Sequence, residues 1–473
     1  MFKNKFSEQR YFLRITVAFS FITVISSYIL LYGIYRINYM DTAWTLSFAW
    51  NYLRHGIRSD IVFRPPENTV TLLFGRTMHV FYGNILDITG WSRNNTTLIS
   101  TFFIFLSAVI WYSILRNMGK THLFASAFAA VFLMMRKTLI SAHLGRPEAM
   151  TLFVISLALL LFIKKKFFLS FFLCTVAVEI HSIGITGFFY IIPTAFFMRK
   201  KLFFPKKDLK NTLIKAGMGI FAGILYYLAF HFRDLSMQSL SYIFDNSHSF
   251  NGYKAPFHGY LHRHFYNYSV EFVLLSVLTS VFFIFRLYRK MVFPSLIFAS
   301  IALSSLIIGR PNGFYAVMAM PALVFFLLSI SESLKAEVFL LIAVVLVFST
   351  HVYEHYKTFR GYNSTKLTEK TKEAMPEDKI PVTALSDFWF TFRDASERRF
   401  IPVSRQNDYK KNFPEEIYFI KTDFWEKRKH SYRKLKTFLD ENYEKKLIFS
   451  STEFKNNKFE IIHCRKNRIN LNN

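Results

Sequence analysis

Long apolar runs separated by short polar segments fill the first three quarters of this 473-residue chain. A transmembrane helix needs roughly 20 mainly apolar residues, and fewer when short helices are buried inside a protein. The pattern therefore predicts a polytopic α-helical membrane protein with about eleven transmembrane helices. We place these spans at residues 15–35, 97–116, 122–135, 149–163, 167–180, 183–198, 212–231, 269–288, 291–309, 313–330 and 337–351.

Residues 167–198 are long enough for one helix or for a tight hairpin that turns at residues 181–184. A run of lysines precedes this segment, and a second basic cluster at residues 199–207 follows it. Cytoplasmic loops collect Lys and Arg, so both ends belong on the cytoplasmic side and the segment must cross the membrane twice. This hairpin predicts a cytoplasmic N-terminus and a C-terminal region outside the cytoplasm.

The segment at residues 36–96, between the first two spans, is too long for a simple connection and is expected to be structured. Residues 41–56 predict an amphipathic helix that Asp41 or Thr42 caps, with aromatic residues on one face and Gly56 at its end. Aromatic residues at this depth indicate a helix lying at the membrane interface. A second such helix is predicted at residues 70–85.

Beyond residue 351 no apolar run is long enough to span a membrane, and short alternating runs typical of strands appear instead. We place strands at residues 382–385, 400–403 and 417–420, a helix at 430–443, and a hairpin at 446–454 and 458–464. The chain therefore divides into a membrane domain, residues 1–351, and a small extracytoplasmic α/β domain, residues 352–473. The tail has no G-x-G-x-x-G or P-loop motif, which disfavours nucleotide binding.

Composition supports this division. Hydrophobic residues make up 52% of the chain and charged residues 19%, which is too apolar for an ordinary soluble enzyme and excludes disorder. The net charge of +28 would suggest nucleic acid in a soluble chain, but most of it is Lys on the predicted cytoplasmic side, where it sets orientation. We therefore expect membrane lipids and no nucleic acid as partners. Two cysteines exclude a disulfide framework and a zinc site built on thiolates.

Within residues 1–351, the acids on the predicted outer side stand beside basic residues that are Arg, except for Lys137 and Lys254. Arg presents a planar fork suited to phosphate and carboxylate oxygens. This outer face is typical of a site for an anionic lipid-linked substrate. Histidines are frequent at residues 231–264, but no HExxH motif is among them, so we expect no metal site and no cofactor.

Asp41 follows the first span at the outer interface, where a carboxylate can remove a proton from an acceptor hydroxyl or bind a metal ion. The alternative is that Asp41 only caps a helix. His143, Arg146 and Glu148 open the fourth span from the outer side. Glu148 suits the positive end of a helix, but His143 and Arg146 have no such structural explanation at a membrane boundary.

Four further residues on the same side complete the candidate site: Arg64, Glu179, His181 and Arg310. A lone buried His or Glu is often a satisfied core group, so each is a weak signal by itself. Their position on one side favours a site for a polyprenyl phosphate, whose leaving phosphate needs cationic stabilisation when the bond to the sugar breaks. We predict that these residues, with His143, Arg146 and Glu148, bind the donor phosphate or sugar.

Two motifs together resemble the bacterial membrane glycosyltransferases of the GT-C superfamily. They are the first span followed by Asp41 and an aromatic helix ending in Gly56, and the Gly-Arg-Pro-Glu segment at residues 145–148. The superfamily includes protein O-mannosyltransferase-like, arabinofuranosyltransferase-like and lipid A aminoarabinose transferase-like branches. The resemblance covers most of residues 1–351 in architecture but only these motifs in residues.

The resemblance implies a bacterial cytoplasmic (inner) membrane enzyme that uses a polyprenyl-phosphate sugar donor. It also implies a glycan, lipid or protein acceptor outside the cytoplasm, inversion at the sugar, and an Asp near the reacting centre, which here is Asp41. The acidic pair common in some branches is absent because Thr42 follows Asp41. That departure argues against a paired-carboxylate or metal mechanism, although the resemblance leaves a divalent metal open.

Two other classes of function remain open on the sequence. A lipid or solute transporter or flippase would also have many spans, but the chain shows no duplicated halves. A non-catalytic envelope assembly protein would explain the α/β tail, and it predicts that Asp41, Arg146 and Glu148 tolerate Ala.

Overall fold

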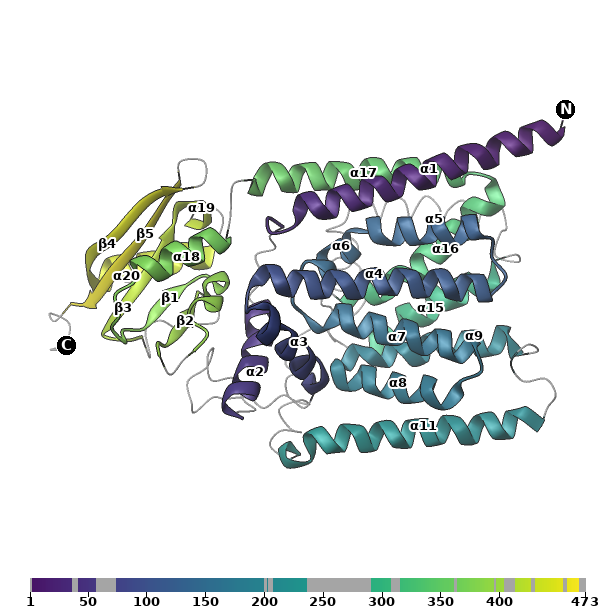
Figure 1. The fold of residues 1–473 in the computed structure, drawn as a ribbon, viewed down its shortest axis with the longest axis horizontal. Helices are drawn as coiled ribbons and strands as arrows, with labels where there is room; N and C mark the ends of the chain where they lie inside the picture. The colour runs from purple at the N-terminus through teal and green to yellow at the C-terminus, as the bar shows by residue number, and fades with distance from the viewer. Residues whose placement is uncertain are drawn as a thin grey trace. The chain divides into compact units, whose positions relative to one another are not determined.

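The computed structural model describes residues 2–35, 41–56, 74–199, 202, 207–235, 291–307, 315–360, 364–394, 397–403, 413–426, 430–453 and 457–467. Its contacts divide the chain into two compact units (Figure 1). The helical unit comprises Met1–Leu31, Leu72–Met78 and Leu98–His355. The second unit comprises Tyr32–Thr71, His79–Thr97 and Tyr356–Asn473. Most of residues 36–96, the predicted first outer loop, therefore belongs to the same unit as the C-terminal tail.

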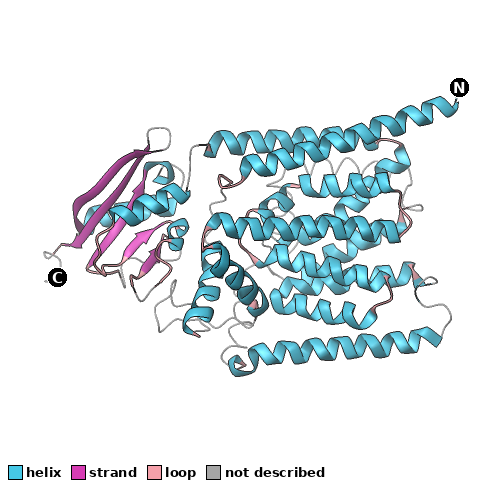
Figure 2. Ribbon diagram, viewed as in Figure 1, coloured by secondary structure: helices cyan, strands magenta, loops and turns pink. Residues whose placement is uncertain are grey.

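The helical unit is a bundle of antiparallel neighbours (Figure 2). In chain order its helices are α1 (Phe2–Leu31), most of α4 (Arg93–Asn117), α5 (His122–Met134), α6 (Arg136–Ala142), α7 (Pro147–Ile163), α8 (Phe167–Ile180), α9 (Thr186–Phe197), α11 (Lys207–His231), α15 (Val292–Ile307), α16 (Met320–Leu334) and α17 (Glu337–Phe359). The 3-10 helices η2 (Ser182–Ile185), η3 (Phe232–Asp234) and η7 (Tyr315–Ala319) lie between them.

Most predicted spans coincide with a helix, and the span predicted at residues 269–288 lies outside the described residues. Among the described helices, five are long and apolar enough to cross a membrane. The number becomes six if α5 and α6, which meet at an angle of 67°, form one broken span. Other apolar helices, such as α7 and α8, are shorter. The chain is therefore a helical protein with several candidate membrane spans.

The predicted hairpin between residues 167 and 198 is confirmed. Helix α8 ends at Ile180, η2 follows, and α9 returns along the bundle. A Cβ atom on Gly184 would collide with the backbone of Ala177, so only glycine lets η2 lie this close to α8. This close turn keeps Glu179 and His181 at the tip of the hairpin.

The second unit combines α2 (Asp41–His55), the larger part of α3 (Arg76–Thr89) and the C-terminal α/β region. That region holds α18 (Ser364–Ala374), α19 (Asp423–Glu426), α20 (His430–Asn442), the 3-10 helix η8 (Ser386–Phe390) and the strands β1 (Val382–Ala384), β2 (Phe400–Pro402), β3 (Glu416–Thr422), β4 (Tyr443–Glu453) and β5 (Asn457–Lys466).

The five strands form one sheet in the order β2-β1-β3-β5-β4. β1 pairs in parallel with β2 and β3, whereas β5 is antiparallel to β3 and β4. Strand β3 is central, and residues 417–420 of it are buried. The mixed sheet with its helices confirms the sheet region predicted near the C-terminus.

The reactivity of Cys464 in β5 can be used to measure whether this sheet is folded. Its side chain is 0% exposed, and burial raises the pKa of its thiol to about 12. Only the thiolate reacts with alkylating reagents, so Cys464 stays unreactive while the sheet is folded.

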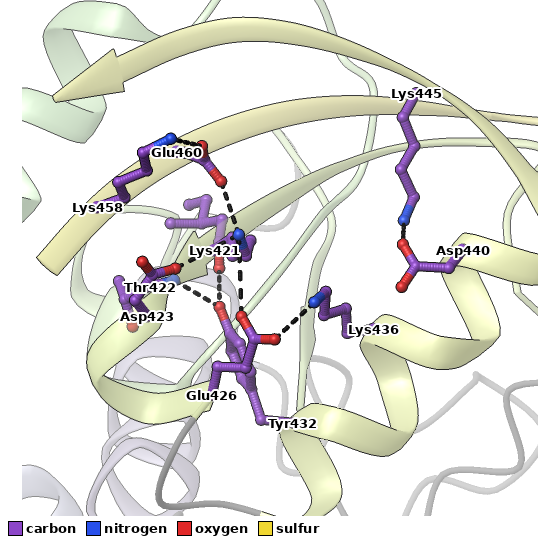
Figure 3. Close-up of polar contacts among 11 residues, drawn as sticks. Lys421, Thr422, Asp423, Glu426, Tyr432, Lys436, Asp440, Lys445, Lys458 and Glu460 are labelled. Carbon is purple, nitrogen blue, oxygen red and sulfur yellow. Dashed lines mark hydrogen bonds and ion pairs between the residues drawn. The ribbon is translucent and has the colours of Figure 1, made fainter.

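Lys421 at the end of β3 joins three elements of the C-terminal region (Figure 3). Its Nζ lies 2.9 Å from Glu460 of β5, 3.4 Å from Asp423 and 3.8 Å from Glu426 of α19. Burial acts to lower the pKa of Lys421, but the hydrogen bond that its ammonium group donates to Glu460 and the three carboxylate charges outweigh burial and raise that pKa. The ammonium group thus supplies the positive charge that these three carboxylates need.

Replacing Lys421 with Met should destabilise the C-terminal region by about 1–2 kcal/mol, between the effects known for exposed and fully buried ion pairs. The measurement is the denaturant dependence of Cys464 alkylation, resolved by mass spectrometry. Lys458→Met is the matched control, because Lys458 is 62% exposed and 4.0 Å from Glu460. An equal effect of both substitutions would contradict this role of Lys421.

The contribution of Lys421 to the stability of the C-terminal region should fall at high pH. Because the folded-state pKa of Lys421 is raised, its contribution is complete below the unfolded pKa and is lost as pH rises through the folded pKa. The difference between wild type and Lys421→Met should stay constant from about pH 7 to 9 and decline only above the ordinary lysine pKa of about 10.4.

Candidate functional site

Buried ionisable side chains gather at one end of the helical unit. The antiparallel order places α6, the start of α7, the end of α8 and the end of α11 toward the same end of the bundle (Figure 1). The buried charged side chains there are Arg76, Lys137, Arg146, Glu148 and Glu179, and the buried histidines are His143, His181 and His231. Four helices of the unit therefore carry buried polar side chains toward the same end of the bundle.

Arg146 and Glu148 form a buried, two-pronged ion pair at the start of α7. Arg146 Nε donates to both carboxylate oxygens of Glu148 at 3.0 Å, and Nη2 donates to Oε1 at 2.6 Å. The two side chains are 7% and 2% exposed. Pro147 occupies the first helical position, so Arg146 is the residue before the helix and Glu148 lies in its first turn. Sequence analysis predicted both residues in the site, and the structure joins them directly.

Glu179 at the end of α8 holds the start of α3. Its Oε1 accepts a hydrogen bond from the backbone N–H of Arg76 at 2.8 Å, and its Oε2 accepts one from the N–H of Thr77 at 3.3 Å and one from the Thr77 hydroxyl. The N–H of Gly75 donates to the Glu179 carbonyl at 2.5 Å. A carboxylate at the free N–H groups of a helix N-terminus is favourable because it meets the positive end of the helix dipole.

The same carboxylate contacts α11. His231 Nε2 donates to Glu179 Oε1 at 3.0 Å, and both side chains are 0% exposed. The hydroxyl of Tyr226 lies 2.7 Å from that of Thr77. Each oxygen of Glu179 accepts hydrogen bonds from the protein, and its predicted role in substrate binding stays a prediction. The residues that sequence analysis missed are Arg76, Thr77, Tyr226 and His231. Of these four, only His231 could have been recognised from the sequence as a candidate site residue, because it is an ionisable residue at the end of a predicted span.

Two other candidates lie at the same end of the bundle. His181 follows α8, accepts a hydrogen bond from the N–H of Ile183 at 3.1 Å, and acts electrostatically on Glu148. Its ring also contacts that of Phe74, with centroids 5.6 Å apart. His143 hydrogen bonds to the carbonyl of Leu139 at 2.8 Å, and its ring lies 5.4 Å from that of Tyr28.

The remaining candidates have no described side chain. Asp41 is the first residue of α2, so its backbone position is known, but its side chain lies outside the described residues. Arg64 and Arg310 also lie outside the described part of the chain. Among the described residues, no group of three or more His, Cys, Asp or Glu side chains is arranged to hold a metal ion.

Small residues on α11 let it approach α8 closely and thereby bring His231 to Glu179. A Cβ atom at Gly219 would collide with the backbone of Phe168 and Phe172, whereas one at Gly217 would meet nothing within 4 Å. Close backbone approach through small residues is a common means of helix association in membranes. The absence of a side chain at Gly219 therefore allows the close packing of α11 against α8, the two helices that carry His231 and Glu179.

Gly219→Ala should separate α8 from α11 and lower the thermal unfolding midpoint of the purified protein in detergent. We expect a loss of about 1–3 kcal/mol, as for other overpacked contacts. Gly217→Ala on the same helix is the matched control, and alanine there should be neutral or stabilising by up to about 1 kcal/mol. If both substitutions lower the midpoint equally, the close contact is not the cause.

Cations exceed anions among the buried side chains of this site. Of the described residues in the helical unit, Arg76, Lys137 and Arg146 are buried bases and Glu148 and Glu179 are buried acids. Guanidinium and ammonium groups of this kind can hydrogen bond to an anionic group such as a phosphate.

Comparison with solved structures finds the same fold in ArnT from Cupriavidus metallidurans. ArnT bound to undecaprenyl phosphate matches with a TM-score of 0.56 and 10% identity, over 95% of this chain and 97% of that chain. ArnT in the apo state matches over the same shares with a TM-score of 0.56 and 9% identity. Comparison with protein-family models and with curated proteins finds no match. The resemblance predicted from the sequence is thus confirmed at the level of the fold: this chain has the fold of ArnT.

Proposed function

We propose that this protein is an integral membrane glycosyltransferase that moves a sugar from a polyprenyl-phosphate donor to an acceptor outside the cytoplasm. The observation that carries the proposal is the fold shared with ArnT over 95% of the chain, including the structure that holds undecaprenyl phosphate. Among the described residues of the helical unit, the buried Arg76, Lys137 and Arg146 support it, because the lipid carrier presents an anionic phosphate.

In the proposed reaction the carboxylate of Asp41 takes the proton of an acceptor hydroxyl. The hydroxyl oxygen attacks the anomeric carbon from the side opposite the phosphate, so the configuration at that carbon inverts. The bond between the anomeric carbon and the phosphate oxygen breaks, and the electron pair leaves with the polyprenyl phosphate. Cationic side chains stabilise this leaving phosphate, with Arg146 oriented for that task by Glu148. Arg64, His143, His181 and Arg310 complete the proposed donor site.

The proposal includes a location and an orientation. The protein would lie in a bacterial cytoplasmic membrane with about eleven spans, a cytoplasmic N-terminus and an extracytoplasmic C-terminal domain. The asymmetric distribution of Lys supports this orientation, because cytoplasmic loops collect basic residues. The acceptor would then be a glycolipid, a surface polysaccharide or a protein.

Mass spectrometry of surface glycans and glycolipids from cells with and without the gene tests the function. We expect one sugar to be missing from a defined product in the deletion strain and to return with the wild-type gene. A second arm measures binding of undecaprenyl phosphate to the purified protein in nanodiscs. Unchanged glycans and glycolipids together with no binding of undecaprenyl phosphate would refute the proposal.

A further inference from the structure

Three segments far apart in the chain meet around Trp50 in the second unit. We call the group the Trp50 cluster. It comprises Trp50 and Arg54 of α2, Asp87 of α3 and Trp91 just after it, and Trp389 and Arg393 of the C-terminal region. The first two segments belong to the predicted outer loop, whereas the third lies at and just after η8, which contacts α2. The cluster is therefore a contact between the outer loop and the C-terminal domain.

The aromatic members of the cluster form an edge-to-face chain. The ring centroids of Trp50 and Trp91 are 5.0 Å apart at 89°, and those of Trp91 and Trp389 are 6.4 Å apart at 71°. Both arrangements are favourable for aromatic pairs. Trp50 is 8% exposed and Trp389 is 0% exposed, so the two outer rings of this chain are buried, whereas Trp91 between them is partly buried.

Two guanidinium groups and one carboxylate complete the cluster. The guanidinium carbons of Arg54 and Arg393 lie 5.2 and 4.8 Å from the Trp50 ring centroid, within the range of cation–π contacts. Asp87 Oδ1 accepts hydrogen bonds from Arg54 Nη2 and from Trp91 Nε1, each at 2.7 Å. Arg393 Nη1 donates to the carbonyl of Phe390 at 2.6 Å, which fixes it to the end of η8.

The cluster reaches the proposed catalytic residue through a single helix. Asp41 and Trp50 belong to α2, so a contact that fixes Trp50 also fixes the backbone of Asp41. The rise of an α-helix places the two residues about 13 Å apart along the axis. The C-terminal domain can therefore set the position of Asp41 without touching substrate.

We propose that Trp389 and Arg393 are positioning residues: through the Trp50 cluster, the C-terminal domain holds α2 and its first residue, Asp41, in place for transfer. The proposal rests on the proposed function for its catalytic consequence. The structural part, that α2 is held by Trp389 and Arg393, stands independently of it. It gives the C-terminal domain a definite role in an enzyme whose substrate site lies elsewhere in the chain.

The structural part is tested in full-length protein with a thiol placed on the buried side of α2. Ala49 is 0% exposed, so the thiol introduced by Ala49→Cys should be unreactive toward a maleimide. Adding Trp389→Ala or Arg393→Ala should raise its labelling rate by about tenfold or more, whereas Trp389→Phe and Arg393→Lys should keep it low. Arg399→Ala is the matched control, because Arg399 is exposed and six residues further on.

The native Cys464 reports on folding in the same experiment. If it stays unlabelled, the C-terminal sheet is intact and release of α2 is local. If Trp389→Ala makes Cys464 reactive, that variant is unfolded and the Arg393→Ala result decides. Continued protection of the introduced thiol in a folded Arg393→Ala protein would overturn the proposal.

The catalytic part is read from the product that the deletion strain lacks. Trp389→Ala and Arg393→Ala should reduce the product by about 10–100-fold, as expected when a reacting group is misplaced by about 1 Å. Binding of undecaprenyl phosphate should be unchanged, and Trp389→Phe and Arg393→Lys should restore the product. Released α2 with undiminished product would overturn the positioning role. A wild-type protein with no product at all would refute the proposed function but leave the labelling result valid.

Discussion

Asp41→Asn should reach the membrane at normal levels and abolish most transfer. Asn has the size of Asp but cannot accept the acceptor proton, so the base contribution of about 10²–10⁴ in rate should be lost. The measurement is the amount of glycosylated product in the deletion strain complemented with the variant. This is the largest effect we expect from a substitution that removes only one charge.

The other role of Asp41, as a helix cap, makes the opposite prediction. Asn caps a helix as well as Asp, so a purely structural Asp41 would give a fully active Asp41→Asn protein. Asp41→Ala separates the two roles further, because it also removes the cap and should lower stability by about 1 kcal/mol. Binding of undecaprenyl phosphate should survive Asp41→Asn. Undiminished transfer with Asp41→Asn would exclude Asp41 as the base.

Breaking the pair of Arg146 and Glu148 should have the largest effect on stability. Each side chain is almost completely buried, so Arg146→Ala leaves the Glu148 charge uncompensated, and the reverse holds for Glu148→Ala. Each single substitution should cost about 3–5 kcal/mol in the free energy of unfolding, and the double substitution should cost less than their sum. The measurement is a double-mutant cycle on thermal unfolding in detergent.

The pair of Lys120 and Glu332 supplies the matched control within the same unit. Its atoms are 2.5 Å apart, but the side chains are 29% and 41% exposed. A double-mutant cycle on Lys120 and Glu332 should give an interaction energy of no more than about 1 kcal/mol. Additive effects at Arg146 and Glu148 would show that the two charges do not depend on each other.

Arg146→Lys should keep the charge but lose the two-pronged contact, and it should therefore weaken transfer.

Sequence periodicity predicted the local elements well. The strands β1, β2 and β3, the helix α20 and the hairpin of β4 and β5 lie within a few residues of their predicted places. Each has a pattern that its own residues determine, such as alternation in a strand. The helix in the first outer loop was predicted at residues 41–56 and observed at Asp41–His55 for the same reason.

What the sequence did not predict depends on distant contacts. Helix α6 was not predicted: it follows the bend after Met134, beyond the span predicted at residues 122–135, and no proline or glycine marks that bend. Glu179 was recognised as a buried acid, but its partners Thr77 and His231 come from segments 102 and 52 residues away. No local pattern contains such pairings. The contact between Trp50 and Arg393 was missed for the same reason.

The composition of the second unit bears on how the protein is made. α2 is synthesised early, yet Trp389 and Arg393, which complete its contacts, emerge about 340 residues later. At about 5–20 residues per second, α2 would wait roughly 20–70 seconds for them. During this interval Trp50 and Trp91 lack their C-terminal partners, so residues 41–56 should stay sensitive to proteolysis until Trp389 and Arg393 have been synthesised. The second unit, and any activity that depends on it, would thus be completed only after residues 356–473 have been synthesised.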